Sequence, residues 1–154
     1  MDARQPGPDA QLSALLSRFS PEIGALAERC LPKLRRTFPG SYELVYDYSN
    51  SVVVAFGMSE RGYEAIVAMA VSPRAVRLYF DKSLPDPKGL LEGSGGKVRS
   101  VTLETASDLE QADIKALIKA AIKHSGVTFS GTGATRMVIK SGSKKAKPKR
   151  AGQA

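Results

Sequence analysis

The 154-residue chain has one cysteine, one histidine and no tryptophan. Cys30 alone cannot form an intramolecular disulfide, and Cys30 with His124 cannot complete a zinc site of cysteine and histidine ligands. No apolar run approaches the roughly 20 residues of a membrane helix, and residues 1–8 are polar where a signal peptide would be apolar. We therefore expect a cytoplasmic protein without a membrane partner.

The composition is that of a single globular domain, with 42% hydrophobic and 25% charged residues. The net charge is +8, but six of the 23 basic residues lie from Lys140 onward, where none of the 15 acidic residues occurs. The rest of the chain is therefore close to neutral. Residues 141–154 contain too few apolar side chains to fold alone, so we expect a disordered basic tail there.

Hydrophobic periodicity and capping residues predict the helices. Within an N-terminal segment of residues 1–19, residues 1–9 are expected to be disordered, and leucines at helical spacing then predict a short helix. The domain proper, residues 20–140, begins with a helix that Ser20 caps and that runs to about Phe38. Ser107 to Glu110 has the form of a capping box and predicts a last helix, which Gly126 would end.

Period-2 patterns predict strands at residues 42–48, 52–57, 63–71, 75–80 and 98–104, with an edge strand at 135–140. The breaks between the first four are short enough for hairpins, which predicts an antiparallel meander. Residues 65–71 are all apolar, as expected of a central strand covered on both faces. The fold class is therefore α+β: an antiparallel sheet of about five or six strands with an N-terminal and a C-terminal helix packed on it. The expected core comprises Ile23, Leu26, Cys30, Leu31, Val54, Ile66, Ala68, Leu78, Phe80, Ile114, Leu117, Ile118 and Ile122.

The long segment before the fifth strand carries a family resemblance. Leu84-Pro85-Asp86-Pro87, followed by Leu90-Leu91-Glu92-Gly93-Ser94-Gly95-Gly96-Lys97-Val98-Arg99, resembles the central motif of the YdhG-like family. Asp108-Leu109 and Leu117-Ile118-Lys119-Ala120-Ala121 continue the match. Members of this family are small α+β proteins of unknown function with a curved antiparallel sheet. Many are labelled iron chaperones because they resemble frataxin, so the resemblance implies iron as a candidate cofactor.

A frataxin-type iron site would be a ridge of exposed carboxylates on the first helix and the following strand, because iron cations prefer oxygen ligands. Glu43 and Asp47 are the metal candidates, since they lie four residues apart on one strand and alternation puts them on one face. The preceding helix carries Lys33, Arg35 and Arg36, whose charge would repel a cation. The simpler interpretation is that both acids are solvated surface side chains.

Glycines in the same long segment expose backbone N–H groups beside basic side chains, which predicts a site for a small anion. Its candidates are Lys82, Lys88, Gly93, Gly95, Gly96, Lys97 and Arg99. The segment is not a P-loop, because Leu91 stands where the first glycine would lie, and no βαβ unit surrounds it as a dinucleotide site requires. Turns that need a positive φ explain the glycines without any ligand.

Basic side chains suggest nucleic acid as an alternative partner. Lys115, Lys119 and Lys123 recur along one face of the last helix, and the tail adds Lys144, Lys145, Lys147, Lys149 and Arg150. Such a stripe is usually the solvated side of an amphipathic helix, but together with the tail it could bind phosphates without reading bases. Aromatic stacking adds little support to this alternative, because tryptophan is absent and the tyrosines lie in strands whose facing the sequence leaves open.

No catalytic arrangement is recognisable. Cys30 lies on an apolar helix face, and His124 lies at the end of a helix, where it can simply favour the dipole. We therefore expect a non-enzymatic binding domain that holds a small ligand or a partner protein near the segment from Asp81 to Arg99. An accessory nucleic-acid-binding protein is the alternative, and an enzyme is the least favoured hypothesis.

Overall fold

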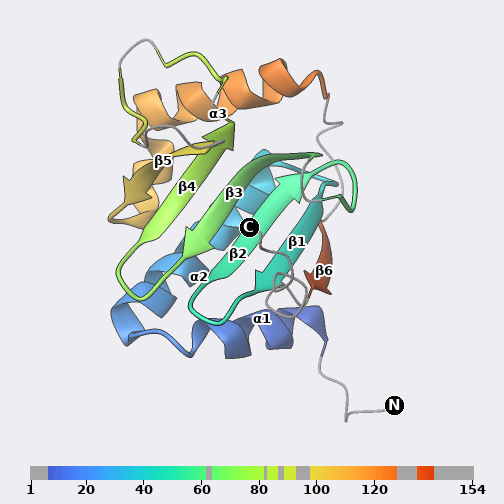
Figure 1. The fold of residues 1–154 in the computed structure, drawn as a ribbon, viewed down its shortest axis with the longest axis vertical. Helices are drawn as coiled ribbons and strands as arrows, with labels where there is room; N and C mark the ends of the chain where they lie inside the picture. The colour runs from blue at the N-terminus through green and yellow to red at the C-terminus, as the bar shows by residue number, and fades with distance from the viewer. Residues whose placement is uncertain are drawn as a thin grey trace, which may run out of the picture.

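The computed structural model describes residues 7–61, 64–81, 83–86, 89–92, 98–127 and 135–140. These residues form an α+β domain in which an open six-stranded sheet carries three helices. Figure 1 shows the strands in the order β5-β4-β3-β2-β1-β6, with β6 at one edge. Their bounds are β1 (Tyr42–Asp47), β2 (Val52–Gly57), β3 (Ala65–Val71), β4 (Val76–Asp81), β5 (Val98–Leu103) and β6 (Arg136–Lys140).

The pairing of β6 differs from the expected antiparallel sheet. β1 to β5 form the predicted antiparallel meander. β6 lies at the edge as expected, but it runs parallel to β1, with Tyr42 opposite Arg136 and Tyr46 opposite Lys140. The sheet is therefore mixed. The chain reaches β6 from the far edge of the sheet, after β5 and a helix, so no hairpin fixes the direction of this strand.

The helices are α1 (Pro8–Leu16), α2 (Pro21–Thr37) and α3 (Ala112–Ser125). α1 begins at Pro8, so the expectation of disorder through residue 9 is wrong at its last two positions. The predicted caps of the longer helices are confirmed: Ser20 Oγ accepts a hydrogen bond from Ile23 N at 3.3 Å, and Gly126 ends α3 with a φ of 78°. No helix in the described part of the chain is both long and apolar enough to cross a membrane.

The capping box before α3 is not formed by the predicted pair, Ser107 and Glu110. A 3-10 helix, η2 (Ala106–Glu110), precedes α3, and its box is formed by Thr105 and Asp108. Asp108 Oδ2 accepts hydrogen bonds from the backbone N of Glu104 at 2.8 Å and of Thr105 at 3.1 Å. The two patterns overlap in sequence, and the extended backbone of Thr105 decides between them.

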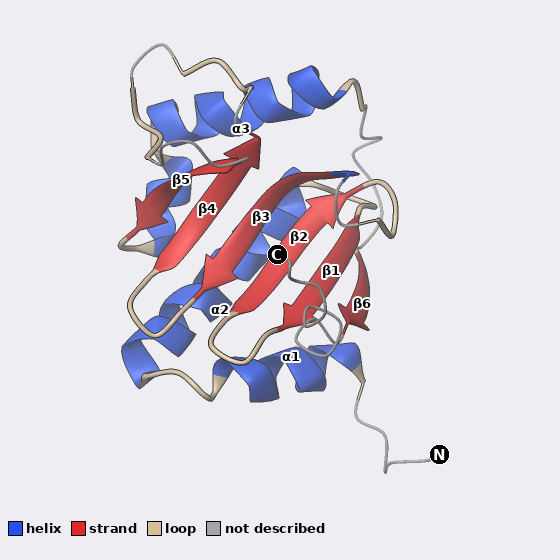
Figure 2. Cartoon of the chain, in the orientation of Figure 1, coloured by secondary structure: helices blue, strands red, loops and turns tan. Residues whose placement is uncertain are grey.

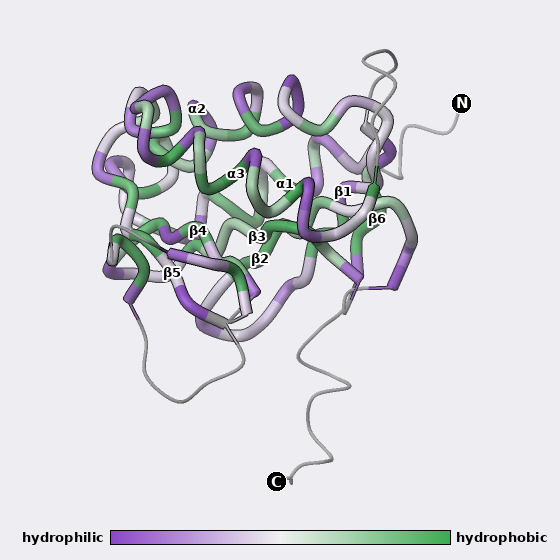
Figure 3. The backbone as a smooth tube through the Cα atoms, turned by 90° about the horizontal axis from the view of Figure 1, so that it is seen from above, coloured by the Kyte–Doolittle hydropathy of each residue, from purple (hydrophilic) through white to green (hydrophobic). Residues whose placement is uncertain are grey.

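All three helices contribute to one hydrophobic core with the same face of the sheet. In Figure 3, α2 and α3 lie on one side of β2, β3 and β4, and Figure 1 shows α1 and α3 across opposite ends of the strands. Twelve of the thirteen expected core residues lie in this core or pack against it, including Cys30, which is fully buried. The prediction is wrong for Ala68, which is partly buried on the other face of the sheet. Burial raises the pKa of the Cys30 thiol to about 11, and the charge of Asp108 adds to the shift.

The expectation that β3 is covered on both faces is wrong. Val67, Met69 and Val71 point into the core, whereas Ala68 and Ala70 are only partly buried on the other face. Figure 2, viewed from that other side, shows the strands in front and α2 behind them. None of the described helices covers this face of the sheet.

Candidate functional site

The sheet face without helices gathers most of the tyrosines. Tyr79 of β4 lies between Leu78 and Phe80, and Tyr46 of β1 follows Val45; these three neighbours are buried in the core, so both tyrosine side chains point the other way. Tyr42 shares the face of Tyr46 because side chains alternate along the strand. Tyr48 stacks beside Tyr46, with ring centroids 6.1 Å apart and 14° between the planes. Four of the five tyrosines therefore lie on this side of the sheet, and all four are partly exposed.

The strand register places small side chains between these rings. One row of Cα partners runs from Leu44 through Ala55 and Ala68 to Tyr79, and the next runs from Tyr46 through Val53 and Ala70 to Arg77. Because neighbouring strands are roughly 5 Å apart, Tyr46 and Arg77 are separated by about 15 Å of sheet with only short side chains between them. We call this surface the tyrosine face; it comprises Tyr42, Tyr46, Tyr48, Tyr79, Arg77, Arg136 and Lys140.

Two cations of β6 lie over tyrosine rings of β1. Arg136 Cζ is 4.3 Å from the centroid of Tyr42, and Lys140 Nζ is 5.8 Å from that of Tyr46. Backbone carbonyls help to hold both, since Arg136 donates to Gly40 O at 3.2 Å and Lys140 to Glu60 O at 2.6 Å. Burial, followed by the neighbouring Tyr48, raises the pKa of Tyr46, so this phenol is neutral at physiological pH. The parallel pairing of β6 thus positions one cation beside each ring.

A second candidate site lies between α2 and α3. It is a cleft of about 880 Å³, with a basic rim on each helix and an apolar floor. We call it the basic cleft; its rims are Lys33 and Arg36 of α2 and Lys115 and Lys119 of α3, and its floor is Leu34, Leu109, Ile118 and Ile122. The fold thereby brings together two lysine and arginine stripes that are about 80 residues apart in sequence.

The electrostatic potential of the basic cleft is positive. Glu110 is the sole acid among the described lining residues, and Lys33 Nζ donates a hydrogen bond to its carboxylate. The pKa of Glu110 is lowered, first by this hydrogen bond and the charge of Lys33, and then by Lys115 and Arg36. Arg36, Lys115 and Lys119 have no ion-pair partner among the residues that the structure describes.

The other predicted nucleic-acid residues lie elsewhere. Lys123 is exposed on α3 but does not line the basic cleft. Lys144, Lys145, Lys147, Lys149 and Arg150 lie outside the described residues.

The metal candidates are both held by arginines. Glu43 is fully buried and accepts two hydrogen bonds from Arg35, so its interpretation as a solvated surface acid is wrong. Asp47, on the same face of β1, lies 3.1 Å from Arg18. Within the described ranges, no three histidine, cysteine, aspartate or glutamate side chains come together as a metal site would require. Neither carboxylate is therefore available to a cation without breaking an ion pair.

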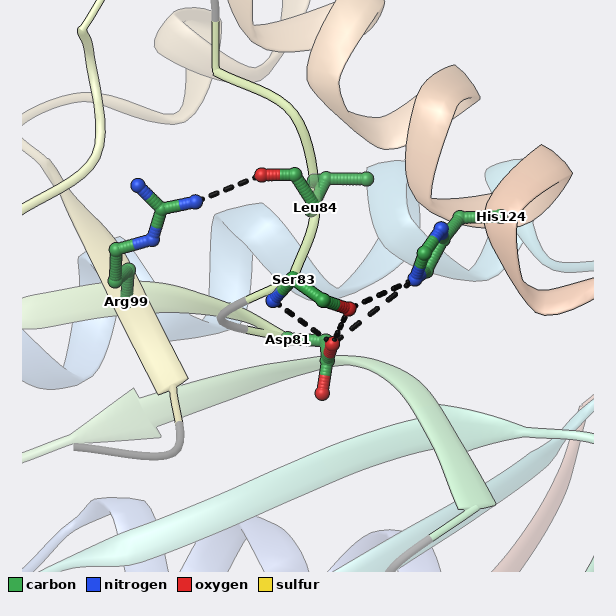
Figure 4. Close-up of polar contacts among 5 residues, drawn as sticks. All are labelled: Asp81, Ser83, Leu84, Arg99 and His124. Carbon is green, nitrogen blue, oxygen red and sulfur yellow. Dashed lines mark hydrogen bonds and ion pairs between the residues drawn. The ribbon is translucent and has the colours of Figure 1, made fainter.

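Of the anion candidates, only Arg99 lies within the described residues; Lys82, Lys88, Gly93, Gly95, Gly96 and Lys97 do not. Arg99 Nη2 donates to Leu84 O at 2.7 Å, which fixes the start of the long segment to β5 (Figure 4). Asp86 holds the same segment together, accepting hydrogen bonds from Leu90 N and Leu91 N, both at 2.9 Å. The arginine therefore has a structural contact that any anion would have to share.

The single histidine joins a polar cluster with Ser83 and Asp81, shown in Figure 4. Ser83 Oγ lies 2.9 Å from His124 Nε2 and also donates to Asp81 Oδ2, and Nε2 is 4.0 Å from that same carboxylate oxygen. In a serine–histidine–aspartate relay, serine and carboxylate contact opposite nitrogens of the ring. Here both face Nε2, and the hydroxyl proton of Ser83 goes to Asp81, so His124 is not placed to accept it.

Comparisons of the chain with protein-family models, curated proteins and solved structures gave no match. The site must therefore be interpreted from its own residues. Sequence reasoning missed the tyrosine face, although Tyr42, Leu44 and Tyr46 alternate with Glu43 and Val45 in the sequence. Both sets contain apolar and polar residues, so the pattern alone does not tell which set faces the helices.

Proposed function

We propose that the protein is a non-enzymatic, accessory nucleic-acid-binding domain that takes single strands on the tyrosine face. The observation that carries this proposal is the convergence of Tyr42, Tyr46 and Tyr79 on one face of the sheet, with cations of β6 over two of the rings. Aromatic side chains stack on bases with about 1–3 kcal/mol per base and with little sequence preference. Between the rings, Val53, Ala68 and Ala70 are partly exposed, whereas Leu44 and Ala55 are buried.

The charges of this surface suit a phosphate backbone. Arg136 and Lys140 lie beside the rings, and Arg77 lies across the sheet, where it forms an exposed ion pair with Glu92 at 3.5 Å. Lys140 is also the last residue of β6, and the next ten residues of the sequence add five positive charges. Phosphate contacts supply affinity without reading sequence, so the proposed binding is salt-dependent and general.

The alternative small-ligand function has less support. Membership of the YdhG-like family stays a hypothesis that rests on the motif between Leu84 and Arg99. Iron handling would need Glu43 or Asp47, and each already meets an arginine. Of the small-anion candidates, only Arg99 lies within the described residues, so the described part of the chain does not bring a group of them together.

Fluorescence anisotropy with a labelled oligothymidylate, which forms no duplex with itself, tests the proposal. Tyr46→Ala and Tyr79→Ala should each weaken binding about 5- to 150-fold, because each removes a stacking ring. Tyr46→Phe and Tyr79→Phe are the matched controls, since they keep the ring and should change the affinity less than threefold. Thermal unfolding must show that all four variants are folded. Wild-type affinity in both folded alanine variants would overturn the proposal.

A further inference from the structure

The basic cleft lies on the helix side of the sheet, away from the tyrosine face, and its chemistry is different. Its floor is apolar and its charges lie in two rows, one on each helix. Leu34 and Ile118 are already buried by the fold, but Ile122 is partly exposed and Ala112 and Ala116 are exposed. A nucleic acid held by the cations alone would leave this apolar surface uncovered. The site therefore suits a ligand that has an apolar stripe with acids on both sides of it.

The walls of the cleft permit another helix to approach. Ala112 and Ala116 lie one turn apart on α3, both exposed and both part of the lining. With no side chain beyond Cβ, they leave space above the floor for the backbone of a third helix. Lys115 and Lys119 are also one turn apart, about 6 Å along the axis, which matches acids at i and i+4 on a partner helix.

The charges of the cleft are not neutralised within the described part of the chain. Lys33 is paired with Glu110, but Arg36, Lys115 and Lys119 have no such partner. Three uncompensated positive charges around one cleft repel each other, and an acidic partner removes that repulsion. Charge complementarity thus selects an acidic ligand, and the apolar floor selects an amphipathic one.

We propose that the basic cleft binds an acidic amphipathic helix of a partner protein. Its apolar stripe covers Ile122, Ala112 and Ala116, and its Asp and Glu side chains pair with the cations of the two rims. This is helix-in-groove recognition, in which residues at i, i+3, i+4 and i+7 supply the anchors. The interaction is independent of nucleic-acid binding on the opposite side of the sheet.

The test uses the full chain and three synthetic peptides of about 16 residues. The probe has a leucine stripe at helical spacing flanked by glutamates; the second peptide has the same composition with the stripe scrambled, and the third has lysine in place of glutamate. Calorimetry should show binding of the probe only, tighter than about 1 mM, and circular dichroism should show a gain of helix in the complex. No binding of the probe, or equal binding of the scrambled peptide, would overturn the proposal.

Matched charge reversals locate the site. Lys119→Glu and Arg36→Glu should each weaken probe binding at least about tenfold, because each replaces an attraction by a repulsion at the rim. Lys123→Glu on α3 and Arg29→Glu on α2 make the same change outside the cleft and should change the affinity less than about threefold. If the rim and control variants changed probe affinity equally, the peptide would not be bound in the basic cleft. Loss of oligothymidylate binding in Lys119→Glu, with peptide binding unchanged, would instead assign the cleft to nucleic acid.

Discussion

Arg35 of α2 and Glu43 of β1 form a bidentate ion pair, with distances of 2.9 Å from Nε to Oε1 and 2.7 Å from Nη2 to Oε2. Glu43 is fully buried, and Thr135 Oγ1 also donates to its Oε1 at 2.7 Å. The hydrogen bond to Glu43 is the main cause of the raised pKa of Arg35. One carboxylate thus connects α2, β1 and the residue that precedes β6, which is the strand that supplies Arg136 and Lys140 to the tyrosine face.

Arg35→Ala should lower the free energy of unfolding by about 3 kcal/mol, because it leaves Glu43 as a buried carboxylate without its cation. This is the low end of the range for breaking buried pairs, since the side chain of Arg35 is still 33% exposed. Urea unfolding followed by circular dichroism measures the loss. Arg29→Ala, an exposed position on the same helix, is the control and should change stability by less than about 0.5 kcal/mol. A loss below about 1 kcal/mol in Arg35→Ala would show that the pair is not structurally important.

Fe(II) should bind weakly if at all, because binding at Glu43 or Asp47 would have to displace Arg35 or Arg18. Calorimetry under anaerobic conditions measures this directly. Submicromolar binding in the wild type that is lost in the variant Glu43→Gln with Asp47→Asn would restore a frataxin-like interpretation of the strand. The control is Glu104→Gln, which alters an exposed carboxylate away from β1 and should leave any iron binding unchanged.

Local patterns predicted most of the secondary structure, since they depend on neighbours in sequence. The period-2 runs gave strands close to those observed, Ser20 caps α2, and Cys30 is buried as its helix face required. The direction of β6 was not predictable in this way. It pairs with a strand about 90 residues earlier, and no turn between them constrains the register.

The tyrosine face and the basic cleft could not be predicted from the sequence for a related reason. Tyr42 and Tyr79 share a face only because β1 to β4 pair in one particular register. Lys33 and Lys115 line the same cleft only because α2 and α3 pack against the same sheet face. Glu43 resembled a surface acid because its partner, Arg35, lies on another element. Each element was predicted separately, but the contacts between elements decide which residues form a site.

Asp108→Asn should lower the free energy of unfolding at pH 7 by about 1 kcal/mol, because it weakens the capping box of η2. The hydrogen bond from Glu104 N is the main cause that lowers the pKa of Asp108 below 3.8, so the ionised form is the one that stabilises the fold. The stabilisation is therefore present above this pH and is lost as the pH falls through the folded-state pKa. Urea unfolding of wild type and variant from pH 7 down to about 3 should show the two converging. A stability difference that is independent of pH would contradict this assignment.

Deleting residues 141–154 tests what the tail adds to the tyrosine face. The deletion removes Lys144, Lys145, Lys147, Lys149 and Arg150, and it leaves every described element in place, so the unfolding temperature should not change. If all five charges contact phosphates, the log–log salt dependence of oligothymidylate binding should be steeper in the full chain by up to about 3.5 units, at roughly 0.7 per phosphate on a single strand. Tyr46→Ala should weaken both forms by the same factor, because stacking and phosphate contacts involve different residues. Equal affinity and equal salt dependence in the two forms would show that the tail takes no part in binding, and the phosphate contacts would then have to come from Arg77, Arg136 and Lys140 or from the lysines of α3.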